Sequence, residues 1–155
     1  MALDQQEMTM SNPILPDLLA LTGAAVAPAE ALLDRARASL RTEFLDGDRI
    51  SGAKLEANQT AAHGLAWLAT YVEALRQMQK WALALTEDDK FGEMEQLIHQ
   101  IAFGEYLNQI YGGIPMNQGE ICRLADLGLG LAKPSHKDVV KLMLEGNTVA
   151  ARSRL

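Results

Sequence analysis

Residues 51–85 carry apolar side chains around most of a helical circumference, and this pattern restricts the fold more than any other feature of the chain. The apolar residues fall on two adjacent rows at helical spacing, which include Leu65, Leu68, Val72 and Leu75 on one row and Trp67, Tyr71, Met78 and Trp81 on the other. One neighbouring helix cannot cover so wide an apolar face. We therefore predict a helix from an N-cap at Ser51 to about Leu85, placed centrally in a helical bundle.

A second long helix is predicted to follow after a short polar connection at residues 86–89. It spans about Lys90 to Tyr111, and the pair Gly112-Gly113 followed by Pro115 ends it. Two long helices with so short a link are expected to fold back as an antiparallel hairpin.

The remaining segments are also predicted to be helical. A helix is expected from Pro28 to about Leu45, since proline is tolerated at the first helical position. Capping signatures predict a short helix from Asn117 to about Leu127 and another from Ser135 to Gly146. Strand signals are scarce, so the predicted fold class is all-α, with a loose N-terminal arm at 1–27 and a helical bundle domain at 28–155. We expect this chain to be a fragment of a longer one.

Charge and composition exclude several classes of protein. The net charge of −6 disfavours binding to the phosphate backbone of nucleic acid. No apolar run approaches the length of a membrane span, and the single cysteine, Cys122, fits a reducing compartment. We expect a cytoplasmic protein in which the Cys122 thiol has no catalytic role.

The titratable residues do not form a recognisable catalytic or metal-binding motif. His63, His99 and His136 fall on separate predicted helices, and no Glu-x-x-His pair of the kind used in di-metal bundles is present. Glu105 lies in an apolar stretch, where burial could make it an acid or base, although pairing with an arginine or reaching the surface is favoured. A small enzyme or metal protein built on Glu95, His99 and Glu105 is the least favoured hypothesis. We predict no catalytic residue and no metal ligand.

Two glycines interrupt predicted helices. Gly64 and Gly104 each lower helix stability by about 0.8–1 kcal/mol relative to alanine. A tight crossing between helices would explain both positions.

Three segments of the chain resemble a known family. The segments are 62–82, 91–121 and 124–129, and the most unusual stretch is GEYLNQIYGGIPMNQGE at 104–120. They resemble the helical N-terminal extension of certain bacterial acyl-CoA dehydrogenases, over roughly residues 30–155. The resemblance implies a parent enzyme that uses FAD to oxidise a short or branched acyl-CoA, such as methylsuccinyl-CoA, to the enoyl-CoA. It also implies that the flavin-binding body and the catalytic carboxylate lie outside these residues, so whether this chain is itself an enzyme stays open.

A second similarity concerns Gln109, Gly112 and Gly113. Their spacing is similar to the Gln-x-x-Gly-Gly of the C-terminal four-helix domain of ordinary acyl-CoA dehydrogenases, where the motif touches the FAD of a neighbouring subunit. The likeness implies a related fold and makes these three residues candidates for cofactor contact. The chain departs from that domain at 114–123.

The resulting hypothesis is an accessory helical domain that packs on a dehydrogenase body in a homo-oligomer. Isolated from that body, the chain is expected to bind no flavin. The alternative is a stand-alone helical interaction or dimerisation module without catalysis. An apolar patch of more than a few hundred Å² would mark the docking face in either case.

Overall fold

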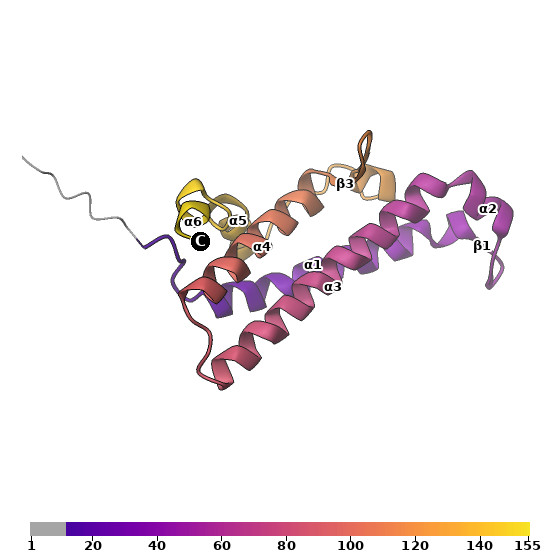
Figure 1. Ribbon diagram of the computed structural model, residues 1–155. Helices are drawn as coiled ribbons and strands as arrows, with labels where there is room; N and C mark the ends of the chain where they lie inside the picture. Colours follow the sequence, from indigo (N-terminus) through magenta and orange to yellow (C-terminus); the bar gives the residue numbers. More distant parts are fainter. Residues whose placement is uncertain (1–11) are drawn as a thin grey trace, which may run out of the picture.

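The computed structural model describes residues 12–155, and three long helices dominate them (Figure 1). These are α1 (Leu18–Phe44), α3 (Gln59–Glu87) and α4 (Glu93–Gly112). The short helices are α2 (Gly52–Ala57), α5 (Lys137–Glu145) and α6 (Val149–Arg154), with a 3-10 helix η1 at Leu124–Leu127. Two small antiparallel pairs join β1 (Leu45–Asp46) to β2 (Arg49–Ile50) and β3 (Ile114–Asn117) to β4 (Glu120–Cys122). The all-α prediction is confirmed.

Helix α1 makes its most extensive contact with α3, and the two lie side by side in Figure 1. The residues predicted to face inward are all buried, namely Leu32, Leu33, Ala36 and Leu40. α3 contributes Leu68, Val72 and Leu75 to the same core. α4 follows α3 through the short connection at 88–92, as expected, and adds Phe103, Leu107 and Ile110. α5 packs against both α1 and α4 and closes the core with Val139 and Leu142.

The first long helix begins earlier than predicted. It starts at Leu18 and contains Pro28 in its interior, so residues 18–27 belong to a helix and not to a loose arm. An internal proline costs about 3 kcal/mol. Burial of Leu18, Ala25 and Ala29 on the core side of the helix offsets that cost. Of the rest of the predicted arm, residues 12–17 precede the helix and residues 1–11 lie outside the described residues.

The predicted helix from Ser51 is divided into α2 and α3 at Asn58. Ser51 is the N-cap, and its hydroxyl accepts a hydrogen bond from the Lys54 N–H at 3.4 Å. Asn58 leaves the helical region with φ −122° and ψ 35°, and its amide donates to the Lys54 carbonyl at 2.9 Å. Asparagine side chains compete in this way with the helix hydrogen bonds of the backbone.

The prediction of a short helix from Asn117 to about Leu127 is wrong. Residues 114–122 form the β3–β4 hairpin, in which Ile114 pairs with Cys122, and the helical turn begins only at Leu124. Asn117 does not cap a helix. Its side-chain oxygen accepts from the Gly119 N–H at 3.1 Å, and its amide donates to the Glu120 carboxylate at 2.7 Å, which closes a turn.

The helix predicted from Ser135 is present as α5, with His136 as the N-cap and Gly146 after its last residue. The following helix, α6, is capped by the Thr148 hydroxyl and was not predicted. Within residues 12–155, no helix is both long enough and apolar enough to cross a bilayer.

Candidate functional site

Glu105 is held by two amide groups and by no cation. Gln109, one turn further along α4, donates to one carboxylate oxygen at 2.6 Å, and Asn147 donates to the other at 2.6 Å. The expected pairing with an arginine is absent, since Glu105 forms no ion pair within residues 12–155, and the residue is half-buried, so part of it reaches the surface. Both carboxylate oxygens are occupied, and this arrangement fits a structural role for Glu105 better than acid–base chemistry.

The hydrogen-bonded chain extends from Glu105 to α3. The Tyr71 hydroxyl donates to the Gln109 side-chain oxygen at 2.5 Å, and the Tyr71 and Tyr106 rings lie 4.8 Å apart between centroids. Burial raises the pKa of Tyr71, with the charge of Glu105 adding a smaller rise, so this hydroxyl keeps its proton. This series of hydrogen bonds thus links α3, α4 and the segment before α6.

The three candidate cofactor residues have different surroundings. The side-chain oxygen of Gln109 accepts a hydrogen bond from Tyr71, and its side-chain nitrogen donates one to Glu105. Gly113 has φ 135°, and a Cβ there would lie 2.6 Å from Ile121 Cγ2, so the close hairpin accounts for this glycine. Gly112 is exposed, has open space where a Cβ would stand, and borders a small groove. Packing therefore explains Gln109 and Gly113 but not Gly112.

His99 is buried in a ring of aromatic side chains. Its ring lies 4.8 Å from Phe103, 5.8 Å from Phe91 and 6.4 Å from Trp81 between centroids. Nε2 is 2.9 Å from the Thr22 hydroxyl, which itself donates to the Leu18 carbonyl, so Nε2 carries the proton. Nδ1 has no partner, and burial lowers the pKa of His99 to about 4. His99 is a neutral core residue.

The other two histidines lie on other elements than His99. His63 on α3 accepts a hydrogen bond from the Trp67 indole at 2.9 Å, and His136 caps α5. Across the described part of the chain, no three His, Cys, Asp or Glu side chains gather in a way that could hold a metal ion. Glu95, His99 and Glu105 therefore do not form one site.

Cys122 is buried against α3. A Cβ on Gly64 would lie 2.3 Å from the Cys122 sulfur, so the hairpin approaches α3 closely at this glycine. Burial, with smaller contributions from Asp126 and Glu120, raises the pKa of the thiol to about 11. Almost no thiolate is present at neutral pH, which makes Cys122 a poor nucleophile.

A shallow apolar groove runs between α3 and α4. We call it the α3–α4 groove; its volume is about 360 Å³ and it is lined by Ala74, Gln77, Met78, Trp81, Ala102 and Tyr106. Trp81 keeps 37% of its surface exposed. Helical spacing places Ile98 and Met94, which are 40% and 59% exposed, on the row of α4 that contains Ala102 and Tyr106. The apolar surface thus continues along α4.

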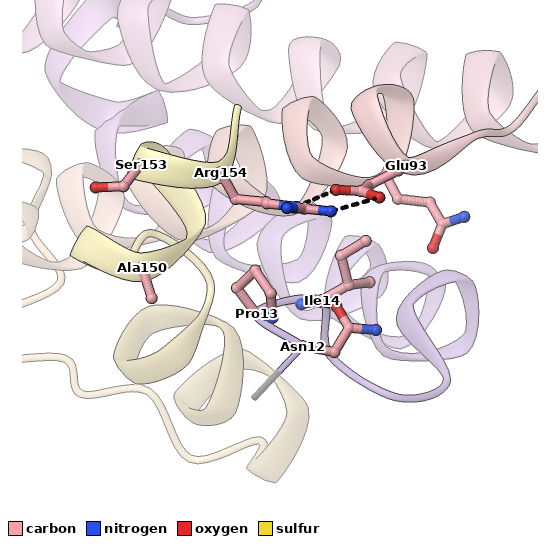
Figure 2. Close-up of a pocket in the computed structure, with 8 residues that line it drawn as sticks. Asn12, Pro13, Ile14, Glu93, Ala150, Ser153 and Arg154 are labelled. Carbon is pink, nitrogen blue, oxygen red and sulfur yellow. Dashed lines mark hydrogen bonds and ion pairs between the residues drawn. The ribbon is translucent and has the colours of Figure 1, made fainter. Parts of the chain in front are cut away.

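A larger pocket lies where the start of α4 meets α6 (Figure 2). Its volume is about 720 Å³, and its lining begins at Asn12, the first described residue. The Arg154 guanidinium reaches across to the Glu93 carboxylate, which joins α6 to the first turn of α4. The two charged groups of the pocket are thereby paired with each other.

No known protein-family profile matches the chain. Over 144 residues, or 93% of this chain, the sequence is 52% identical to a curated protein, (2S)-methylsuccinyl-CoA dehydrogenase from Cereibacter sphaeroides. The chain matches a fragment of an acyl-CoA dehydrogenase. The resemblance predicted from segments 62–82, 91–121 and 124–129 is confirmed. The chain spans 26% of the length of that relative.

Proposed function

We propose that this chain is an accessory helical domain of an FAD-dependent acyl-CoA dehydrogenase that packs on the flavin-binding body of the enzyme. The observation that carries the proposal is the 52% identity to part of a dehydrogenase whose remaining length could supply that body. The parent enzyme would oxidise a short or branched acyl-CoA, such as methylsuccinyl-CoA, to the enoyl-CoA. FAD and the catalytic base would belong to the body, because the candidate groups of residues 12–155 do not suit acid–base or nucleophilic chemistry. Glu105 is held by two amides, burial keeps His99 neutral, and burial raises the pKa of Cys122.

The α3–α4 groove supports the proposal as the docking face. Interfaces are rich in aromatic residues and methionine at their centres, and the groove combines Trp81, Tyr106 and Met78 without a charged side chain. Ile98 and Met94 extend this surface. We infer that the dehydrogenase body covers this face.

Contact with FAD is proposed for one member of the Gln-x-x-Gly-Gly motif. Gly112 is exposed and has no packing role, so a cofactor of a neighbouring subunit can approach its backbone closely. Gln109 and Gly113 would support this position from within the fold. This contact requires a homo-oligomeric enzyme, which we place in the cytoplasm because the single cysteine fits a reducing compartment.

A chimera tests the proposal. This chain would replace the matching 26% of the methylsuccinyl-CoA dehydrogenase, and flavin content and methylsuccinyl-CoA oxidation would be measured. We expect a flavin-loaded, active chimera, and an Ile98→Lys variant that loses flavin or activity at least about tenfold. The matched control is Ile50→Lys, at an exposed isoleucine of β2 far along the chain from the groove, which should leave both unchanged.

Two outcomes would overturn the proposal. A chimera that folds but neither holds flavin nor oxidises the substrate, even though the parent does, would contradict the assignment as an accessory domain. A chimera unaffected by Ile98→Lys, together with a stable dimer of the isolated chain that this change disrupts, would favour the stand-alone dimerisation module.

A further inference from the structure

The α3–α4 groove is lined by one alanine from each of its two helices. Ala74 on α3 and Ala102 on α4 lie beside the larger Met78, Trp81 and Tyr106. An alanine leaves space for the side chain of a partner, because it projects only a Cβ atom from its helix. The lining therefore fits a row of apolar side chains that enters between the two helices, as when the ridge of one helix packs into the groove of others.

Within residues 12–155, the groove offers a partner no backbone hydrogen-bonding group. Its lining lies inside α3 and α4, whose N–H and carbonyl groups bond within each helix. The polar groups of the lining belong to the side chains of Gln77, Trp81 and Tyr106, and the Gln77 nitrogen already donates to Glu73 at 2.6 Å. An extended segment on this face would bury N–H and carbonyl groups without partners, at about 1–3 kcal/mol for each. A helix satisfies these groups internally, so this face favours a helix as the segment that covers it.

A cation lies at the α3 side of the groove. Helical spacing places Lys80 three residues after Gln77, on the solvent side of the lining. Lys80 is exposed and forms no ion pair with any carboxylate of residues 12–155. Glu73, two turns earlier on the same flank, is paired with Arg76 instead. A partner with an acidic side chain at its edge would complement the charge of Lys80.

We propose that the α3–α4 groove receives an amphipathic helix of the dehydrogenase body, with its apolar row against Ala74 and Ala102 and an acidic side chain facing Lys80. The inference rests on the proposed function, because that function supplies the body. The matched relative is long enough to provide such a helix, since this chain spans only 26% of its length. Exposed Ile98 and Met94 would extend the apolar contact along α4.

Photocrosslinking in the chimera tests which kind of segment fills the groove. Benzoylphenylalanine would replace Gln77 or Trp81, which both line the groove and lie about 6 Å apart along α3. The cross-linked peptides would be mapped by mass spectrometry in the flavin-loaded enzyme. A helix is expected to be cross-linked from the two positions at body residues three or four apart, because its rise per residue equals that of α3. Benzoylphenylalanine at exposed Ile50 on β2 is the control and should give no cross-link to the body.

The cross-links distinguish failure of this inference from failure of the proposed function. Body residues two apart, as in a strand that rises about 3.3 Å per residue, or cross-links scattered over loops would overturn the helix and leave docking by this face intact. Cross-links only to a second copy of this chain, or none from either position in an active chimera, would overturn docking by this face and the helix with it.

Two variants test the alanine and the cation separately. Ala102→Trp fills the groove and should lower the flavin content or activity of the chimera at least about tenfold, whereas Ala53→Trp on exposed α2 should not. Lys80→Glu, a change at an exposed position, should lower them about two- to fivefold, and Lys137→Glu at the exposed start of α5 should leave them unchanged. A chimera with Ala102→Trp that behaves as the parent would overturn the helix, and one with Lys80→Glu that does so would overturn its acidic contact.

Discussion

Replacing Gly104 by alanine tests the closest helix contact in the molecule. A Cβ on Gly104 would lie 2.7 Å from the Asn147 backbone nitrogen and 3.0 Å from the Gly146 carbonyl carbon and the Leu142 oxygen. All three are backbone atoms and cannot rotate away. The segment after α5 must therefore move by about 0.7 Å to restore ordinary contact.

That movement loosens the hydrogen bonds that cross the same junction. They are Gln100 to the Gly146 carbonyl at 3.1 Å, Asn108 to the Met143 carbonyl at 2.8 Å and Asn147 to Glu105 at 2.6 Å. Weakening each by roughly 0.5–1 kcal/mol costs about 1.5–3 kcal/mol, and the better helix propensity of alanine returns about 1 kcal/mol. We expect Gly104→Ala to lower the free energy of unfolding by about 0.5–2 kcal/mol.

The assay is urea unfolding followed by circular dichroism at the helix band. Gly112→Ala is the matched control, since Gly112 lies on the same helix and an added Cβ meets nothing within 4 Å. The control should be as stable as the parent chain or slightly more stable. A Gly104→Ala variant at least as stable as Gly112→Ala would refute the close approach of α5 to α4.

Three further predictions concern buried polar groups. The folded-state pKa of His99, about 4, lies below its ordinary 6.5, so the unfolded chain takes up the proton first as the pH falls. The free energy of unfolding should be highest above pH 6.5 and should fall by up to roughly 3 kcal/mol as the pH drops towards 4. In urea titrations, His99→Phe should flatten this pH dependence, whereas His136→Gln should leave it in place. Because the pKa of Cys122 is raised, a disulfide reagent at pH 8 should react roughly a hundredfold more slowly with the folded chain than with the chain unfolded in guanidinium. Equal reaction rates would show that the thiol is accessible in the folded chain. Tyr71→Phe leaves the Gln109 oxygen without its donor and should cost about 1–2 kcal/mol in the same unfolding assay, whereas no loss would mean that this hydrogen bond is absent in solution.

The long helices could be predicted because their apolar rows are local to the sequence. The inward positions of α1 follow from helical spacing alone, and Ser51 caps a helix as expected. The start of α1 could not be predicted, because burial of Leu18 and Ala25 against other elements outweighs the cost of Pro28. The local sequence pattern therefore predicts that a helix forms, while tertiary contacts determine where it begins and ends.

The β3–β4 hairpin shows how one signature serves two structures. Asn117 and Glu120 have the spacing of a capping box, but the same side chains also form the hydrogen bonds of a tight turn.

Of the two glycines predicted to mark helix crossings, only one does so. Gly104 lies at a helix crossing as predicted, whereas Gly64 meets the sulfur of Cys122 on a strand.

The candidate site depends on contacts that are distant in sequence. Glu105 accepts a hydrogen bond from Asn147, which lies 42 residues away in the sequence. Gln109 accepts one from Tyr71, which lies 38 residues away. Spacing could identify Gln109 and Gly112 as candidates only through the resemblance. The grouping of Arg123 and Lys133 around Gly112 requires the loop before α5 to fold over the end of α4, which no local pattern indicates.

The most direct test of the docking account is hydroxyl-radical footprinting of the α3–α4 groove. Trp81 and Met94 are exposed and readily oxidised, so their modification rates would be compared between the isolated chain and the dehydrogenase chimera. The account predicts rates at least severalfold lower in the chimera, with the rate at exposed Ile50 unchanged as an internal reference. Equal rates at Trp81 and Met94 in the two proteins would contradict the claim that a dehydrogenase body covers this face.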